Sequence, residues 1–317
     1  HLSIRRQRQM CIRDRRKPYF NLKNVAYLCM DALGMRRKIV FSEKCLNYGD
    51  WHIEGPTRVK MAHEFLKEKN YEFLEPKPAS EEDVLRVHDA DYVWKLKKGL
   101  VEDTDTPAYA DIYEYARLSA GGALLAAEIN GFSLMRPPGH HAGRSGAALG
   151  VYTRGFCYVN NVAVAVKAMG KAALILDIDG HHGNGTQEIF QGDKKVVYVS
   201  LHRYPFYPGT GSASEGNCLN FPLPANCGEQ RYLETLDEAL GMVDIGSFEV
   251  VAVSVGFDAH TKDLASLGLT ENSYMEIGRR IGLLKKPTFF VLEGGYMGEQ
   301  NGIDIDQFLS GYEEKVV

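Results

Sequence analysis

The sequence predicts a single α/β domain in which helices cover both faces of a mostly parallel central sheet. From residue 35 onward, short β-rich runs alternate with helical stretches, as they do in doubly wound sheets. Most of these runs are continuously apolar rather than alternating, which is typical of strands buried on both faces. The 317 residues are 44% hydrophobic and 25% charged, so the chain can bury one large core.

Six β-rich runs are the expected strands. They are KIVF (38–41), FSLM (132–135), AALILDID (172–179), KVVYVSL (195–201), EVVAVSVG (249–256) and PTFFVLEGG (287–295). Apolar residues at helical spacing predict helices at 57–69, 112–129, 160–169, 230–243 and 273–284. Gly121 and Gly122 fall inside the second helix, where we expect another segment to pack closely. No repeat or linker interrupts residues 35–317, so we expect one domain.

Residues 1–34 differ in charge from the rest of the chain. They carry eight Lys or Arg residues and two acidic residues, although the formal net charge of the whole chain is −4. Such a segment is typical of a nucleic-acid-binding arm or a targeting peptide, but it lacks the serine content and amphipathic period of a transit peptide. The stretch QMCIRDR also resembles translated adapter sequence. We expect residues 1–34 to be a non-native tail outside the fold.

Composition narrows the class of protein. No apolar run approaches the roughly 18 residues that a membrane helix needs, and the net charge does not favour nucleic acid. The six cysteines are scattered, without a CxxC pair, which indicates reduced thiols rather than a disulfide framework. We therefore expect a cytoplasmic protein without nucleic-acid or membrane partners, and a homo-oligomer stays open.

Chemically active side chains follow the carboxyl ends of the predicted strands. Ligands of doubly wound sheets bind beyond these ends. The segments found there are PPGHHAG, DIDGHHGNGT, HRYPFYPGTG, FDAH and the tyrosine of LEGGY. Polar loops placed by chance would not concentrate aspartate, histidine and tyrosine so consistently, so the sequence predicts a functional site at this edge of the sheet.

A metal centre is predicted from two of these segments. Asp179 and His181 are two residues apart, so on an extended chain their side chains project to the same side. Asp258, at the end of another strand, can supply a third ligand. Two carboxylates and one imidazole leave coordination positions open, as in catalytic sites. Zn²⁺ is the first expectation and Fe²⁺ its competitor. A lone D-x-H would more simply cap a loop, but the third strand end favours metal binding.

The adjacent His140 and His141 follow a buried run and two stiffening prolines. Such a pair can bind metal, act as general base and acid, or lie on the surface, and this rigid context favours catalysis. Tyr296 follows Gly294 and Gly295, so its hydroxyl can be presented to a developing oxyanion. A Gly-Gly-Tyr turn by itself is weak evidence for this role.

Together these motifs resemble the histone deacetylase superfamily, which includes acetylpolyamine amidohydrolases and acetoin-utilisation-type proteins. The resemblance runs from about Met35 to the C-terminus. It rests on HIEGPTRV (52–59), RPPGHHAG (136–143), GFCYVNNVAVA (155–165), DIDGHHGNGTQEIF (177–190), SLHRYPFYPGTG (200–211), GFDAH (256–260) and LEGGY (292–296). It implies an arginase/deacetylase-like fold and hydrolysis of an N-acetyl amide on a primary amine, either acetyl-lysine of a protein or an acetylated polyamine.

The resemblance also assigns roles to individual residues. It implies one divalent ion, Zn²⁺ or Fe²⁺, which activates water and is held by Asp179, His181 and Asp258. It assigns His140 as electrostatic partner, with Asp177 as the group that orients it. His141 is the proton shuttle, tuned by Asn184, and Tyr296 is the donor to the oxyanion. A structural K⁺ is implied at Asp177, Asp179, His181, Ser200 and Leu201, and substrate contacts at Asp105, Gly155, Phe156, Tyr207 and Leu264.

Two positions depart from part of the family. Asn184 stands where one branch carries aspartate, and a neutral amide stabilises an imidazolium less than a carboxylate does. We therefore expect His141 to stay neutral to lower pH. The loop at 257–270 is one residue short, so Leu264 falls where polyamine-selective members place a glutamate. An apolar residue there favours an acetyl-lysine side chain over a cationic polyamine.

Two other functions are alternatives to this one. An arginase-type ureohydrolase shares the fold, but it uses a two-metal centre with more carboxylates than the three ligands found here. A non-catalytic deacetylase-like binding protein would be favoured if a ligand, a histidine of the pair or Tyr296 were missing, and all are present.

Overall fold

Residues 36–316 are described by the computed structural model, so the tail at 1–34 lies outside the described residues. An eight-stranded sheet runs through them in the order β2-β1-β3-β8-β7-β4-β5-β6, with every neighbouring pair parallel. Its strands are β1 (Ile39–Val40), β2 (Phe73–Leu74), β3 (Phe132–Ser133), β4 (Ala173–Asp177), β5 (Val196–Arg203), β6 (Cys218–Leu223), β7 (Val250–Val255) and β8 (Thr288–Leu292). The predicted parallel α/β fold is confirmed.

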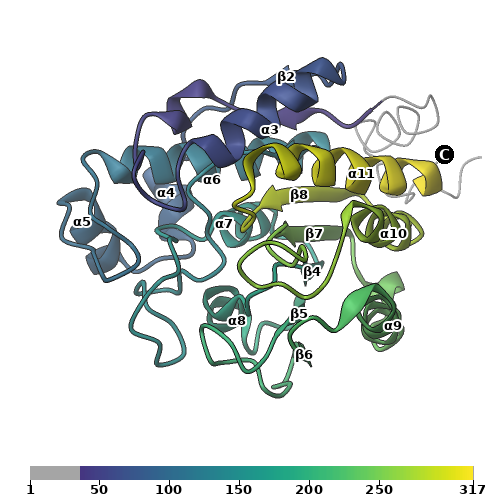
Figure 1. Cartoon of the computed structure of the whole chain (residues 1–317). Coiled ribbons are helices and arrows are strands. Elements are labelled where there is room, and N and C mark those ends of the chain that lie inside the picture. The colour runs from purple at the N-terminus through teal and green to yellow at the C-terminus, as the bar shows by residue number, and fades with distance from the viewer. Residues whose placement is uncertain (1–35, 317) are drawn as a thin grey trace, which may run out of the picture. The chain divides into compact units, whose positions relative to one another are not determined.

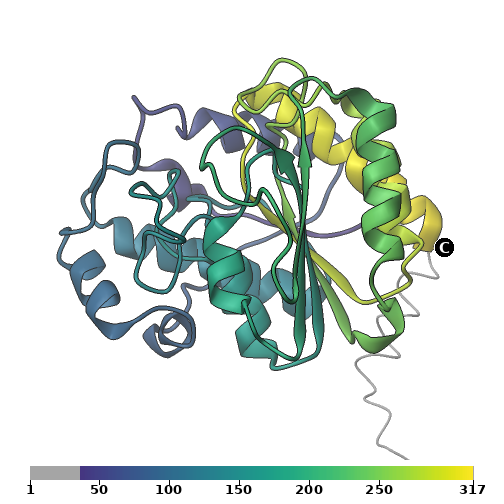
Figure 2. The same cartoon turned by 90° about the horizontal axis from the view of Figure 1, so that it is seen from below.

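Helices cover both faces of the sheet (Figures 1 and 2). One hydrophobic core lies under α3 (Thr57–Glu68), α9 (Gly228–Gly241), α10 (Glu271–Gly282) and α11 (Gly298–Val316). The other lies under α4 (Glu81–Leu85), α5 (Ala90–Lys97), α6 (Ile112–Ile129), α7 (Asn161–Met169) and α8 (Asn184–Phe190). Two short 3₁₀ helices, η1 (Glu43–Leu46) and η2 (Ile245–Ser247), complete the described elements. Within residues 36–316, no helix combines the length and apolar character needed to cross a membrane.

The six predicted strands and five predicted helices are all present, with ends that differ by a few residues. The prediction missed β2, β6, α4, α5, α8 and α11. Strand β6 contains Pro222, which a central strand does not tolerate, and the structure places β6 at the edge of the sheet. Helix α11 begins in a polar stretch, but its buried Ile305, Phe308, Leu309 and Tyr312 follow helical spacing that could have revealed it.

Strand β4 lies between β5 and β7, so three strand ends meet at one edge of the sheet. The last residue of β4, Asp177, is in register with Ser200 of β5 and Ser254 of β7. Because all three strands are parallel, the residues that follow them emerge together. This register is why residues scattered from 177 to 258 can build one site.

The glycine pair in α6 marks a close contact, as predicted. A Cβ atom on Gly121 would lie only 1.9 Å from the main-chain oxygen of Lys77, and one on Gly122 would lie 2.5 Å from Met135 Cγ. The backbone N–H of Ala79 also donates to the carbonyl of Arg117 in this helix, at 2.8 Å. Segment 77–79 therefore crosses α6 at backbone distance.

We expect Gly121→Ala to destabilise the protein by about 1–3 kcal/mol, because backbone must move to admit the methyl group. Denaturant unfolding monitored by circular dichroism measures the change. The matched control is Gly241→Ala at the end of α9, where a Cβ would meet no atom within 4 Å. There, stability should stay the same or rise by up to about 1 kcal/mol, since alanine is the better helix former. Equal losses at both positions would contradict the packing argument.

Candidate active site

Three predicted metal ligands converge at the carboxyl ends of β4 and β7. Asp179 and His181 follow β4, Asp258 follows β7, and one potential ligand atom of each lies within 4.8 Å of the other two. The distance from His181 Nδ1 to Asp258 Oδ2 is 2.7 Å, and to Asp179 Oδ1 it is 3.1 Å. Both carboxylates are buried, while the His181 side chain is 12% exposed.

The donor atoms suit a cation. Backbone N–H groups hold both oxygens of Asp179 and one of Asp258. Gly294 donates to Asp179 Oδ2 at 2.7 Å, and His181 donates to Asp179 Oδ1 at 2.8 Å. Gly180 donates to Asp258 Oδ1 at 2.8 Å. Asp258 Oδ2 is buried and accepts no well-aligned hydrogen bond, although His181 Nδ1 is close. An uncompensated buried carboxylate is costly, and a bound cation removes that cost.

The electrostatics also favour positive charge at this point. Burial lowers the pKa of the His181 imidazole, but Asp258 and Asp179 outweigh it and raise that pKa to about 10. Because the two carboxylates favour the positively charged form of His181, they also favour a metal cation at the same point. Two oxygens and one nitrogen fit Zn²⁺ or Fe²⁺, and the set leaves coordination positions open.

A second cluster of potential ligands is formed by His260, Glu271 and Asp304, whose ligand atoms also lie within 4.8 Å of one another. It is more open than the first, since the side chain of Glu271 is 47% exposed. The two clusters share no ligand. Among the described residues, the geometry therefore gives no support to the bridged two-metal centre of a ureohydrolase.

His140 lies against two carboxylates. Its Nδ1 is 3.1 Å from Asp177 Oδ2, and its Nε2 is 3.7 Å from Asp179 Oδ1. Burial lowers its pKa, but Asp179 and Asp177 outweigh this and raise the pKa to about 10. The two carboxylates therefore favour the charged form of His140. Asp177 itself also accepts a hydrogen bond from the Tyr198 hydroxyl at 2.9 Å and lies in register with Ser200, next to Leu201.

The pKa of His141 is shifted in the opposite direction to that of His140. Burial and the positive charges of His140 and His181 hold its pKa well below the usual range, so its imidazole is neutral. Its Nδ1 is 2.8 Å from Asn184 Oδ1, and the Asn184 amide nitrogen donates to Ala148 O at 3.0 Å. The amide oxygen therefore faces the ring, so Nδ1 carries the hydrogen and Nε2 keeps its lone pair. Adjacent titratable groups with opposed pKa shifts are typical of an acid and base pair.

Buried groups outside the predicted set hold the histidine loop in place. Glu293 Oε2 accepts the backbone N–H groups of Gly139 at 2.7 Å and His140 at 3.0 Å. At the far end of the loop, His88 Nδ1 lies 2.9 Å from Gly143 O. Glu293 could have been found from its position directly after β8, but nothing in the sequence near His88 signals this contact.

Tyr296 is held by partners from distant parts of the chain. Arg58 donates to the carbonyls of Glu293 and Gly295, and its guanidinium carbon lies 4.9 Å from the centre of the Tyr296 ring. Asp263 Oδ2 accepts the Tyr296 backbone N–H at 2.7 Å. Burial raises the pKa of the phenol well above its usual range, so the hydroxyl remains a hydrogen-bond donor at neutral pH. Arg58 and Asp263 were both missed as site residues.

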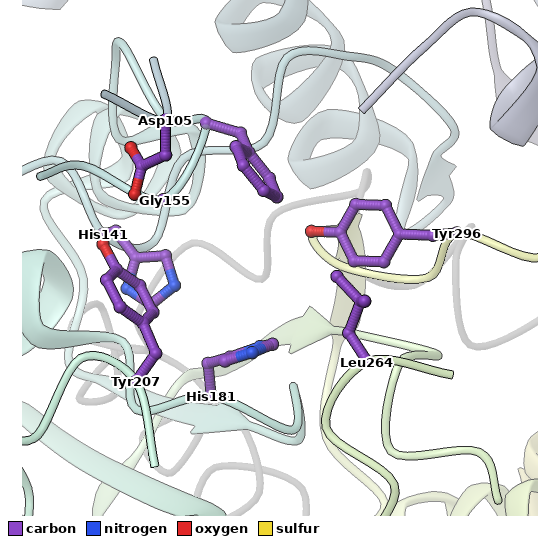
Figure 3. Close-up of a pocket in the computed structure, with 8 residues that line it drawn as sticks. Asp105, His141, Gly155, His181, Tyr207, Leu264 and Tyr296 are labelled. Carbon is purple, nitrogen blue, oxygen red and sulfur yellow. The ribbon is translucent and has the colours of Figure 1, made fainter. Parts of the chain in front are cut away.

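A narrow cavity leads to these groups (Figure 3). It is lined by Asp105, His141, Gly155, Phe156, His181, Tyr207, Leu264 and Tyr296, which include every residue predicted to contact substrate. Its volume is about 130 Å³. A cavity of roughly 150 Å³ holds one benzene-sized group, so this one admits a slender chain rather than a folded segment.

Comparison with known proteins identifies the family of this chain. The sequence profile described as "Histone deacetylase domain" matches residues 52–311. The chain belongs to the histone deacetylase family. A probable deacetylase of Archaeoglobus fulgidus is 39% identical over 299 residues, covering 82% of this chain and 81% of the relative. Acetylpolyamine amidohydrolase 1 of Pseudomonas aeruginosa is 35% identical over 232 residues, covering 67% and 65%.

Solved structures of the histone deacetylase family agree with the fold. The acetylpolyamine aminohydrolase of Burkholderia pseudomallei superposes with a TM-score of 0.80 at 27% identity, covering 87% of this chain and 98% of that one. The protein is therefore a hydrolase, either a deacetylase or an acetylpolyamine amidohydrolase. Members of this family generally depend on a metal, and the buried Asp179, His181 and Asp258 group can bind one.

We expect Asn184→Asp to shift the pH dependence of catalysis. A carboxylate at Asn184 would stabilise the imidazolium of His141, so its pKa rises and the neutral form is lost at higher pH. The acidic limb of the kcat/KM profile against pH should therefore move upward, because it reports the base of the free enzyme. An unmoved limb would show that His141 is not the titrating group, or that Asn184 does not tune it.

Proposed function

We propose that this enzyme hydrolyses the N-acetyl amide of an acetylated primary amine and releases acetate. The observation that carries the proposal is that His141, His181 and Tyr296 line the same small cavity. These side chains combine a neutral base, a metal ligand and a hydroxyl donor. That combination suits attack of water on an amide carbonyl.

The cation would be held by Asp179, His181 and Asp258, and Zn²⁺ is the first choice. When bound, such an ion activates water and polarises the acetyl carbonyl. We also propose a structural K⁺ at Asp177 and Ser200, with the main-chain oxygens of Asp179, His181 and Leu201. Support comes from the register of β4 and β5, which sets Asp177 beside Ser200.

Three side chains of the protein carry out the remaining steps of the reaction. His141 Nε2 accepts a proton from the attacking water and returns it to the leaving amine, since its lone pair is free. His140, positively charged between Asp177 and Asp179, supplies fixed positive charge beside the reacting centre. Tyr296 donates its hydroxyl hydrogen to the carbonyl oxygen as negative charge develops there.

An acetyl-lysine side chain is the substrate that we favour. Its four methylenes match a cavity walled by Phe156, Tyr207 and Leu264. An acetylated polyamine is the second candidate, and Asp105 supports it. Burial would raise the pKa of Asp105, but its interactions with Asp103 and with the Thr106 hydroxyl, which donates to Asp105 Oδ1 at 2.7 Å, hold that pKa below the usual range. The cavity wall therefore carries a negative charge at Asp105.

Metal removal tests the mechanism. Chelation should abolish release of acetate from an acetyl-lysine peptide, and Zn²⁺ or Fe²⁺ should restore it. Elemental analysis should find about one divalent ion per chain, with bound potassium after dialysis in potassium buffer. Asp258→Asn should lose the divalent ion. Two divalent ions per chain would favour the ureohydrolase, and one ion without turnover would favour a binding protein.

Leu264→Glu tests the choice of substrate. A carboxylate on this wall attracts a cationic amine, so kcat/KM for acetylspermidine relative to an acetyl-lysine peptide should rise on the order of tenfold. Leu264→Gln is the control, because it matches glutamate in size but lacks the charge. An equal rise in both variants, or none in either, would contradict a role for charge at this position.

A further inference from the structure

Asp263 connects two residues of the cavity wall through a single carboxylate. Its Oδ1 accepts the backbone N–H of Leu264 at 2.6 Å, and its Oδ2 accepts the backbone N–H of Tyr296 at 2.7 Å. Figure 3 shows Leu264 and Tyr296 beside each other, across the cavity from His141 and Tyr207. Hydrogen bonds to an ionised carboxylate are shorter and stronger than those to neutral acceptors.

Tyr296 needs such a support because of where it stands in the chain. Strand β8 ends at Leu292 and α11 begins at Gly298, so Tyr296 lies in neither element. It follows two glycines, of which Gly295 has a φ of +113°, a conformation that leaves the backbone many alternatives. Arg58 and Asn301 hold the carbonyl of Gly295, but the Tyr296 N–H itself bonds to Asp263.

The Leu264 contact fixes the orientation of the carboxylate. With Oδ1 occupied by the N–H of the next residue, Oδ2 is turned toward Tyr296. Asp263 itself does not line the cavity. It therefore reaches bound substrate only through the residues it holds.

We propose that Asp263 is a positioning residue that sets the place of the Tyr296 hydroxyl in the cavity. This inference rests on the proposed function, in which that hydroxyl donates to the developing oxyanion. A purely structural Asp263 would stabilise the loop at 257–270 without any particular effect on Tyr296. The two roles differ in what happens when the hydroxyl is removed.

The first experiment is a double-mutant cycle of Asp263→Asn and Tyr296→Phe. Asparagine keeps the shape, but it offers one acceptor oxygen to two N–H donors, so one contact is lost in either orientation. In the wild-type background we expect kcat on an acetyl-lysine peptide to fall on the order of tenfold. In the Tyr296→Phe background the same substitution should change kcat less than twofold. Equal factors in both backgrounds would overturn the proposal.

Asp244→Asn is the matched control. Asp244 is exposed and also accepts a backbone N–H, from Gly246 at 3.0 Å, but it does not line the cavity. Its loss should leave kcat unchanged. Thermal unfolding of each variant shows whether a change in kcat comes from loss of fold.

The second experiment does not depend on turnover. With 3-fluorotyrosine incorporated, the ¹⁹F resonance that is absent from Tyr296→Phe reports the ring directly. It should shift or broaden in Asp263→Asn and stay in place in Asp244→Asn. An unmoved resonance overturns the positioning role even if the enzyme is active. If the wild-type protein releases no acetate but the resonance moves, the proposed function fails and the positioning stands.

Asp263→Glu covers the case in which the asparagine variant does not fold. It keeps the negative charge but carries the oxygens one methylene further, so the two N–H groups cannot both be met in the same geometry. We expect the Tyr296 resonance to move and kcat to fall while the protein stays folded. A wild-type spectrum with wild-type kcat would overturn the proposal.

Discussion

The structure is organised around negative charge buried at the carboxyl ends of β4 and β7. Asp177, Asp179 and Asp258 are all fully buried within a few residues of these strand ends. Such charges are tolerated only when they are paired or bind metal, and breaking the compensation is strongly destabilising. The surrounding groups provide part of that compensation: His140 and His181, whose pKa values the carboxylates raise, and backbone N–H groups that donate to Asp179 and Asp258.

This charge distribution also gives two neighbouring histidines different chemistry. The charged form of His140 is favoured because this side chain faces Asp177 and Asp179. That charge, together with burial, keeps His141 neutral. The asparagine at position 184 follows the same logic, since a neutral amide fixes the ring and stabilises its charged form less than a carboxylate would. One row of carboxylates therefore shifts the pKa values of the two histidines in opposite directions.

The sequence allowed prediction of the side chains that meet at the strand ends, because parallel strands bring their carboxyl ends to one edge. Asp179, His181 and Asp258 are found close together for that reason. The supporting contacts were not predictable in the same way. His88 and Gly143, or Arg58 and Gly295, are far apart in the chain, and their pairing depends on how helices and loops pack. No local pattern of residue types encodes such contacts.

The glycines of the site show even more clearly what the sequence alone cannot predict. The local sequence suggests turns at these positions, but glycine is required because there is no room for a Cβ atom. A Cβ on Gly256 would lie 2.1 Å from Asp179 Oδ2, one on Gly294 would lie 2.5 Å from Asp258 Oδ2, and one on Gly183 would lie 2.3 Å from Asp177 Oδ2. Each of these glycines faces one of the three buried carboxylates. A side chain at any of them would displace a carboxylate from its partners, so the need to bury charge at this edge also dictates where the chain can carry no side chain.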